Sequence, residues 1–230
     1  MTGRTDASGA LGVLAGLPTA VVSDALDRLG LPGSVHGIAP LRDGQRACGT
    51  AFTVSYKPVD GTGGTVGDFL DDVPAGAVVV IDNHGRTDCT VWGGIMTRVA
   101  ATRGVAATVV NGVCRDVATC AEVGYPLWSA GRFMRTGKDR VRVAAVQQPV
   151  VIDAVTVRRG DIVCCDDDGV VVVPTVHAAE VTGVAAEIED VESRIVDAIQ
   201  AGARLAEARS RFGYHALQSA AEASAQRDAR

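Results

Sequence analysis

Two short, uninterrupted apolar runs constrain the fold of this chain more than any other feature. Residues 77–81 and 106–110 consist almost wholly of Ala, Val and Ile, and a helical apolar pattern over 95–103 separates them. Strands covered on both faces have this composition, and a strand–helix–strand order favours a parallel βαβ unit. The sequence therefore predicts an α/β protein built around a buried parallel sheet.

Other segments extend this pattern on both sides. Thr19 is a candidate N-cap for a helix over 19–29, which Gly30 would end. Helices are also expected over 66–70 and 117–123, and strands over 47–56, 126–129, 141–146, 150–157, 162–165 and 170–174. A long helix over 176–200 carries one apolar stripe, which would pack either on its own domain or on a neighbouring subunit.

No linker or internal repeat divides these elements, so the sequence predicts one domain over residues 17–212. Residues 1–16 are expected to be a flexible lead-in. Residues 213–230, rich in Ala, Ser and charged side chains, are expected to be a disordered tail.

Composition excludes some classes of function. The net charge of −5, without an evident basic cluster, disfavours binding to nucleic acid or to an anionic membrane surface. No apolar run approaches the roughly 20 residues of a membrane span, and the N-terminus has no signal-peptide pattern. We therefore expect a cytoplasmic protein, with its six cysteines as reduced thiols.

The ends of the two apolar runs indicate where a ligand would bind. In parallel α/β sheets, ligands bind beyond the carboxyl ends of the strands, so the loops 82–94 and 111–116 should converge. A glycine-containing helix start offers free backbone N–H groups to an anion, a guanidinium suits a carboxylate, and an aspartate is a hard ligand for Mg²⁺ or Mn²⁺. The residues concerned are Gly93, Gly94, Ile95 and Met96 at the helix start, followed by Arg115 and Asp116.

Several of these residues have simpler interpretations. An adjacent Arg–Asp pair is often a solvated surface turn. His84 could be a proton shuttle or a solvated loop histidine, and Cys114 a nucleophile or a small packing residue. The acidic run 166–168 could bind a cation, although a turn before a buried strand is the stronger interpretation.

A set of motifs resembles one family along most of the chain. The segments are Ser23–Asp27, Val91–Gly93, Val109–Asp116, Gly160–Val163 and Asp166–Val170. Their order and spacing are similar to those of the RraA-like family. That family contains 4-hydroxy-4-methyl-2-oxoglutarate / 4-carboxy-4-hydroxy-2-oxoadipate aldolases and regulators of ribonuclease E activity.

This resemblance implies a swivelling β/β/α-type α/β domain with a long C-terminal helix, assembled as homotrimers or homohexamers with sites between subunits. It also implies a Mg²⁺- or Mn²⁺-dependent class II aldolase. Arg115 and Asp116 would be the catalytic pair, with Asp116 as the metal ligand. The backbone of Gly93 to Met96 would bind the carboxylate of a small 2-oxo acid.

The chain departs from the aldolase pattern at one position. The aldolases carry an acidic residue 21 positions before the motif arginine, and this chain has Gly94 there. Loss of a carboxylate that holds metal-bound water typically weakens metal binding by about 10–100-fold. Asp82 and Asp88 are candidates to replace it.

Three functions remain open from the sequence. The first is retro-aldol cleavage of a small 2-oxo acid to give pyruvate, or oxaloacetate decarboxylation. The second is a non-catalytic regulator that binds a protein partner. The third is a related enzyme that acts on a different acid.

Overall fold

The computed structural model describes residues 7–60, 66–214 and 217. Its helices are α1 (Ala7–Leu14), α2 (Thr19–Leu29), α3 (Gly94–Thr102), α4 (Val117–Val123), α5 (Ala178–Gln200) and α6 (Leu205–Arg211), with short 3-10 helices η1 (Asp68–Asp72) and η2 (Thr175–His177). Its strands are β1 (Ser34–Val35), β2 (Ala39–Pro40), β3 (Ala47–Pro58), β4 (Val78–Thr90), β5 (Ala107–Cys114), β6 (Leu127–Arg132), β7 (Val141–Val146), β8 (Val150–Ile152), β9 (Val155–Val157), β10 (Ile162–Asp166) and β11 (Gly169–Val173).

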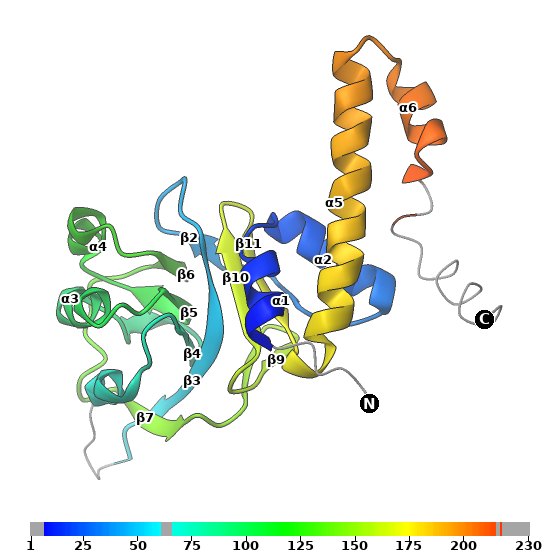
Figure 1. Ribbon diagram of the computed structural model, residues 1–230. Coiled ribbons are helices and arrows are strands. Elements are labelled where there is room, and N and C mark those ends of the chain that lie inside the picture. The colour runs from blue at the N-terminus through cyan, green and yellow to red at the C-terminus, as the bar shows by residue number, and fades with distance from the viewer. Residues whose placement is uncertain (1–6, 61–65, 215–216, 218–230) are drawn as a thin grey trace.

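Helices cover both outer faces of a double layer of strands (Figure 1). Helices α3 and α4 pack on the parallel strands β3 to β6, and α1, α2 and α5 pack on β10 and β11. Between the two groups of strands lies an all-apolar layer to which the hairpin β8–β9 also contributes. The single α/β domain and the long C-terminal helix predicted from the sequence are confirmed.

The apolar runs form strands that are buried on both faces, as their composition predicts. In β4, Val78 and Val80 face the layer between the sheets, whereas Val79 and Ile81 face α3 and α4. In β11, Val170 and Val172 face the same inner layer, and Val171 and Val173 contact α2 and α5 instead. The two-residue period of a strand therefore gives each of these runs two buried surfaces.

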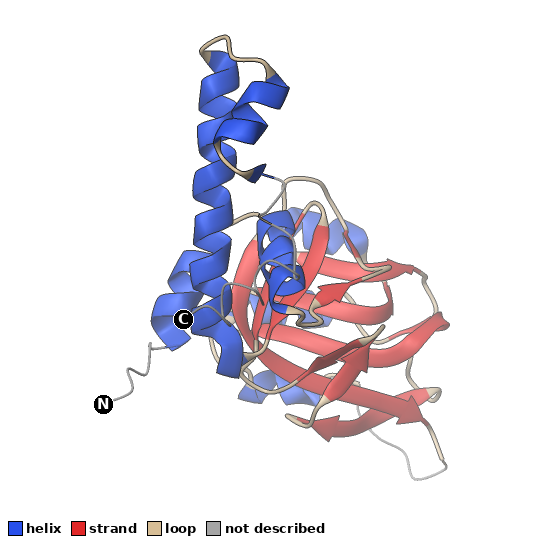
Figure 2. Ribbon diagram, turned by 90° about the vertical axis from the view of Figure 1, so that its right-hand side faces the viewer, coloured by secondary structure: helices blue, strands red, loops and turns tan. Residues whose placement is uncertain are grey.

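Strand β3 joins the two groups of strands. Its first residues pair antiparallel with β10, and its later residues pair parallel with β4 and antiparallel with β7. The strand order is β1-β11-β10-β3-β4-β5-β6-β2, in which β3, β4, β5 and β6 run parallel. Figure 2 shows the strands gathered beside the long helix α5. The carboxyl ends of these four strands consequently meet at one edge.

Two central strands are longer than the sequence predicted. β4 continues through the expected loop to Thr90, and β5 continues past Asn111 to Cys114. Register shifts between Asp82 and Arg86, and between Arg86 and Thr90, keep the two strands paired in this region. The sequence did not predict this irregular extension, because residues 82–90 are mostly polar and lack the apolar pattern of a buried strand.

Several element ends also differ from the sequence prediction. Thr19 is the first helical residue of α2 rather than a cap, and its hydroxyl and amide both donate to the Asp166 carboxylate. Gly30 does end α2 in the left-handed conformation, at φ 67°. The expected strand over 150–157 is the hairpin β8–β9, and the acidic run 166–168 forms the turn between β10 and β11.

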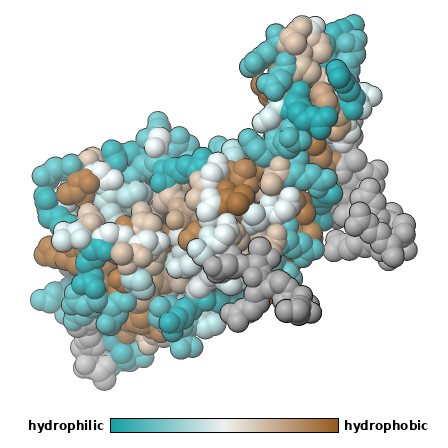
Figure 3. All heavy atoms as spheres, in the orientation of Figure 1, coloured by the Kyte–Doolittle hydropathy of each residue, from teal (hydrophilic) through white to brown (hydrophobic). Residues whose placement is uncertain are grey.

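The chain ends hold structure that the sequence did not indicate. Helix α1 lies in the expected lead-in, and its Ala10 and Leu14 are buried beside α5, since a short apolar face suffices to anchor a helix on a longer one. Helix α6 packs against the far part of α5, which projects beyond the strands (Figure 1). The surface of this projection is largely hydrophilic on the face shown in Figure 3. The predicted tail, 213–230, falls almost entirely outside the described residues.

Two cysteines are joined, which contradicts the expectation of six free thiols. Cys48 in β3 and Cys164 in β10 occupy directly paired positions and form a disulfide. Cys89, Cys114, Cys120 and Cys165 are free and buried. Cys164 and Cys165 face opposite sides of β10, as expected for neighbours in a strand.

Among the helices in the described parts of the chain, none combines the length and apolarity needed to cross a membrane.

Candidate functional site

The turn after β4 is fixed by a buried threonine. The hydroxyl oxygen of Thr90 lies 2.9 Å from the carbonyl oxygens of both Trp92 and Val113, and it accepts a hydrogen bond from the Trp92 amide at 3.2 Å. Thr90 is 3% exposed. Because Val113 belongs to β5, this one side chain ties the turn to the neighbouring strand.

The side chain of Trp92 stabilises the first turn of α3 through Thr97. Its fully buried indole donates from Nε1 to the Thr97 hydroxyl at 3.0 Å and stacks on Tyr125. The Thr97 hydroxyl also lies 3.1 Å from the Gly93 carbonyl oxygen. The Gly93 carbonyl is thereby hydrogen-bonded inside the protein. The first amides of α3 have no partner within the helix and remain available to other groups.

Arg115 and Asp116 follow β5 directly and lie over this helix start. The Arg115 amide donates to the Trp92 carbonyl at 3.0 Å, which fixes the backbone of the pair against the turn. Asp116 adopts a left-handed conformation, with φ 56° and ψ 40°, a region that Asp and Asn tolerate better than most residues. Its Oδ2 accepts a hydrogen bond from the Gly94 amide at 2.8 Å and lies 3.6 Å from Arg115 Nε.

This close approach needs a residue without a side chain at position 93. A Cβ on Gly93 would lie 2.9 Å from Asp116 Oδ2 and 3.1 Å from Arg115 Nε. A Cβ on Gly94 would lie 3.3 Å from the Cβ and Oδ2 of Asp116 and from Thr119 Oγ1. The glycines let a guanidinium, a carboxylate and backbone amides share a small volume.

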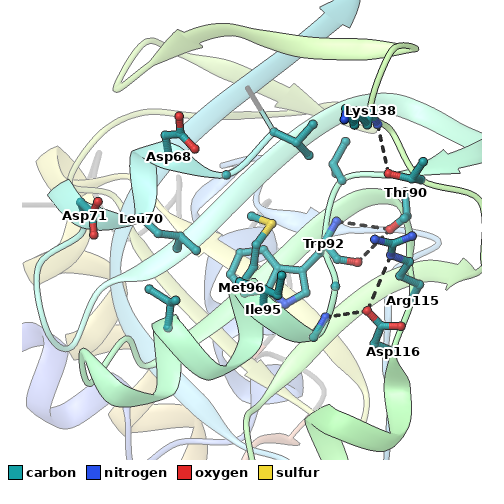
Figure 4. Close-up of a pocket in the computed structure, with 17 residues that line it drawn as sticks. Asp68, Leu70, Asp71, Thr90, Trp92, Ile95, Met96, Arg115, Asp116 and Lys138 are labelled. Atoms are coloured by element: carbon teal, nitrogen blue, oxygen red, sulfur yellow. Dashed lines mark hydrogen bonds and ion pairs between the residues drawn. The ribbon is translucent and has the colours of Figure 1, made fainter. Parts of the chain in front are cut away.

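These groups line a cavity of ≈ 600 Å³ (Figure 4). All six residues expected at the site contribute to its wall, namely Gly93, Gly94, Ile95, Met96, Arg115 and Asp116. The two loops therefore meet at one edge, as the strand order predicted. The side chain of Ile95 is 84% exposed. The backbone amide of Ile95, in contrast, belongs to the first turn of α3.

Other wall residues were not among the expected site residues, although Val91 and Trp92 belong to a segment that carries the family resemblance. The additional wall residues are Val66, Gly67, Asp68, Leu70 and Asp71 near η1, Thr90, Val91 and Trp92 in the turn, Val99 in α3, and Thr136 and Lys138 after β6. Thr136 reaches the site because it bridges to Thr90, and a Cβ on Gly137 would lie 2.4 Å from the Thr90 carbonyl oxygen.

The sequence around Lys138 is unusually basic. Residues 132–142 contain four Arg and one Lys, so the expectation of no basic cluster is wrong here. Several of these side chains have partners within the chain: Arg132 donates to the Leu41 carbonyl, Arg140 to the Thr136 carbonyl, and Arg142 pairs with Asp60.

The donor groups present fit a metal held by a single carboxylate. Within the described residues, no cluster of three or more His, Cys, Asp or Glu could hold an ion. Of the three aspartates that line the cavity, Asp116 is the one hydrogen-bonded to the Gly94 amide. Mg²⁺ commonly binds proteins through one or two carboxylates and completes its octahedron with water and substrate, so Asp116 suits Mg²⁺ or Mn²⁺ in that manner.

The two carboxylates considered as replacements at position 94 are engaged elsewhere. Asp82 accepts hydrogen bonds from the Asn111 side chain at 2.9 Å and from the His84 amide at 2.8 Å. Asp88 pairs with Arg86, which holds the pKa of the Asp88 carboxyl below its usual range. Neither is among the residues that line the cavity.

The alternative catalytic residues also lie apart from the cavity wall. His84 Nε2 is 2.9 Å from the Tyr56 carbonyl oxygen, and Nδ1 is 3.3 Å from Asp82 Oδ2. Cys114 is buried beside Ser129, and burial raises the pKa of its thiol. A raised pKa disfavours the reactive thiolate, so the packing interpretation of Cys114 is the better one.

The chain is an α/β protein with a mixed sheet, and its cavity lies where the parallel strands end, the place at which such sheets commonly bind small ligands. A family model described as RraA-like (Aldolase/RraA) matches residues 19–172. This chain belongs to the RraA-like family.

Two relatives illustrate the range of the family. The chain is 39% identical over 199 residues to Protein DlpA of Legionella pneumophila, covering 85% of this chain but 32% of DlpA. It thus spans about a third of that relative. It is 32% identical over 160 residues to a Halalkalibacterium halodurans protein named "Putative 4-hydroxy-4-methyl-2-oxoglutarate aldolase", covering 69% of this chain and 73% of the other.

Solved structures agree with the fold. An uncharacterized protein from Pseudomonas syringae is 46% identical, with a TM-score of 0.81, covering 88% of this chain and 97% of that one. RraAS2 of Streptomyces coelicolor, described as an unusual member of the RNase ES inhibitor RraA family, is 29% identical with a TM-score of 0.73, covering 84% and 98%.

Proposed function

We propose that this protein is a divalent-metal-dependent carbon–carbon lyase that acts on a small 2-oxo acid. The reaction would be retro-aldol cleavage that gives pyruvate, oxaloacetate decarboxylation, or both. The observation that carries the proposal is the convergence of the Gly94 amide, the Arg115 guanidinium and the Asp116 carboxylate on one face of the cavity.

Each group has a distinct task in this proposal. The amides at the start of α3 bind the substrate carboxylate, because they lie at the positive end of a helix. Arg115 donates to the oxygen at C2, on which negative charge develops as the C3–C4 bond breaks. Asp116 would hold Mg²⁺ or Mn²⁺, which supplies Lewis-acid polarisation of the keto group.

The position of Asp116 supports a double role. In the structure its Oδ2 accepts a hydrogen bond from the Gly94 amide, so an incoming carboxylate would use the next amides of the helix start, those of Ile95 and Met96. Both oxygens of a carboxylate can accept, so Asp116 can retain the Gly94 amide through one oxygen and offer the other to a cation. The side chain is about half exposed, which leaves room for water on that cation.

Pyruvate release from oxaloacetate with Mg²⁺ tests the proposal. We expect a rate above the metal-only background in the wild type and the background rate in Asp116→Ala. Equal rates for the two proteins would remove Asp116 from the mechanism. A thermal melt with Mg²⁺ and oxalate adds a binding readout, because a ligand of the folded state raises Tm.

A second candidate is a non-catalytic regulator that binds a protein partner. Gly94 in place of the aldolase acidic residue favours it, and the similarity to RraAS2 is consistent with it. Absence of both decarboxylation and metal-dependent stabilisation would support this function over the first. The expected trimer or hexamer is common to both candidates and is measured by light scattering after size-exclusion chromatography.

A further inference from the structure

The cavity has two ends of different chemistry. Arg115, Asp116 and the Gly94 amide form a polar end. The cavity is also lined by apolar side chains from η1, the residues before it and α3, namely Val66, Leu70, Ile95, Met96 and Val99. Figure 4 shows Leu70 and Met96 on one side of the cavity, and Arg115 with Asp116 on the other.

Met96 makes the apolar end compact. A Cβ on Gly67 would lie 3.2 Å from both Cγ and Sδ of Met96, so this side chain packs closely on the chain that leads into η1. Leu70 is 4% exposed, and Phe69 beside it is also buried. The wall is therefore supported by the core behind it and presents a defined apolar surface.

The charges near this end are negative. Asp68 and Asp71 lie in the first turn of η1 and line the cavity. Asp71 is 3.7 Å from Arg103, whereas Asp68 has no basic partner among the described residues. The negative charge of Asp68 also helps to raise the pKa of buried Tyr56, after the larger effect of burial. Lys138 lies on the Arg115 side of the cavity, away from Leu70 and Asp71 (Figure 4).

We infer that the substrate carries one acid group, at the Arg115 end, and an uncharged apolar group at the end formed by Leu70 and Met96. This inference rests on the proposed function and specifies its substrate class. A second carboxylate placed at that end would lose water against apolar side chains and meet the field of Asp68. An aliphatic group there would gain from burial.

The size of the cavity agrees with this substrate class. A volume of ≈ 600 Å³ lies in the range that accommodates ligands considerably larger than pyruvate. The amide and guanidinium groups occupy only one end of it. The remaining wall is available to the part of the substrate beyond C3.

Isothermal titration of the full chain, with Mg²⁺ present, tests the inference with straight-chain 2-oxo acids of three to six carbons and with 2-oxoglutarate. We expect the affinity to rise about two- to fourfold for each added methylene, since burial of one methylene contributes up to roughly fourfold. The decisive pair has five carbons each, and 2-oxopentanoate should bind more tightly than 2-oxoglutarate.

Matched variants locate the effect. Met96→Gln should flatten the dependence on chain length, whereas Met134→Gln, at a position 74% exposed and outside the cavity wall, should leave it as in the wild type. Asp68→Asn should narrow the gap between 2-oxopentanoate and 2-oxoglutarate by removing a like charge.

The outcomes separate this inference from the proposed function. Arg115-dependent pyruvate binding with a flat chain-length series, or with tighter binding of 2-oxoglutarate, would overturn the inference and leave the function standing. No binding of any 2-oxo acid would overturn both. A rising series that Met96→Gln flattens and Met134→Gln does not supports the inference.

Discussion

The carboxylate of Asp116 accepts a hydrogen bond from the Gly94 amide at 2.8 Å, across two different βα connections. An acidic side chain from the start of α4 thus caps α3 from outside that helix, since the N-cap residue of α3 is Gly93 and has no side chain to do so. The same contact places a cation ligand beside an anion-binding helix end.

Replacing Asp116 by Asn separates its two roles. Asn tolerates φ 56° and keeps an oxygen for the Gly94 amide, but it lacks the charge that holds a cation. We expect Tm to change little, and Mg²⁺-dependent pyruvate release to fall by roughly 10²–10³-fold, as when a transition-state electrostatic group is removed. Asp116→Ala should additionally lower the free energy of unfolding by about 1–2 kcal/mol, because Ala is strained at positive φ. Undiminished turnover in Asp116→Asn would contradict the metal-ligand role.

Introducing an acidic residue at position 94 tests the departure from the aldolase pattern. Gly94→Asp should tighten Mg²⁺ binding by about 10–100-fold, measured by titration calorimetry. Its Cβ would lie 3.3 Å from Asp116 Cβ and Thr119 Oγ1, a contact that a shift of a few tenths of an ångström relieves. Gly94→Asn is the control of equal size. If the two variants bind Mg²⁺ equally, no metal-bound water lies near position 94.

Removing the Thr97 hydroxyl tests how the turn is supported. Thr97→Val preserves shape but leaves the buried Trp92 N–H without its acceptor. A buried unsatisfied donor costs about 1–3 kcal/mol, so Tm should fall by roughly 2–4 °C for each kcal/mol. Thr102→Val on the same helix is the control, because that hydroxyl is exposed and, within the described residues, donates to the Arg98 carbonyl alone. Equal melting temperatures for the two variants would show that the indole bond does not stabilise the turn.

The buried thiols predict a loss of stability at alkaline pH. Burial raises the pKa values of Cys89, Cys114, Cys120 and Cys165 above the usual 9.0, so the folded protein retains protons that the unfolded chain releases. Their contribution to stability is present below pH 9 and is lost as pH rises through the folded values. Urea unfolding from pH 7 to 10.5 should show this decline, less steeply in Cys165→Ala. A free energy of unfolding that stays constant above pH 9 would contradict it.

Much of the fold followed from apolar periodicity, because the central strands are buried on both faces and show it in their composition. The meeting of the 93–96 turn with Arg115 and Asp116 followed from the rule that parallel strands end at one edge. Other features depend on contacts distant in sequence. The pairing of Cys48 with Cys164 arises from the register of β3 against β10, and 116 positions separate the two residues.

The apolar end of the cavity was unpredictable for a similar reason. Leu70 and Lys138 reach the site from segments on either side of it in the chain, through packing of η1 on α3 and the bridge from Thr136 to Thr90. Neither segment has a local pattern that specifies this placement. The polar end could be predicted because two consecutive βα connections build it.

Because both sheets share β3 and enclose one apolar layer, they cannot swing apart as hinged bodies without breaking main-chain pairing and wetting that layer at once. A substrate would therefore reach the site without a hinge movement of the sheets, and η1 and the segment after β6 both line the cavity that it would enter. Binding should leave the scattering profile of each subunit unchanged and alter amide exchange mainly in those two segments.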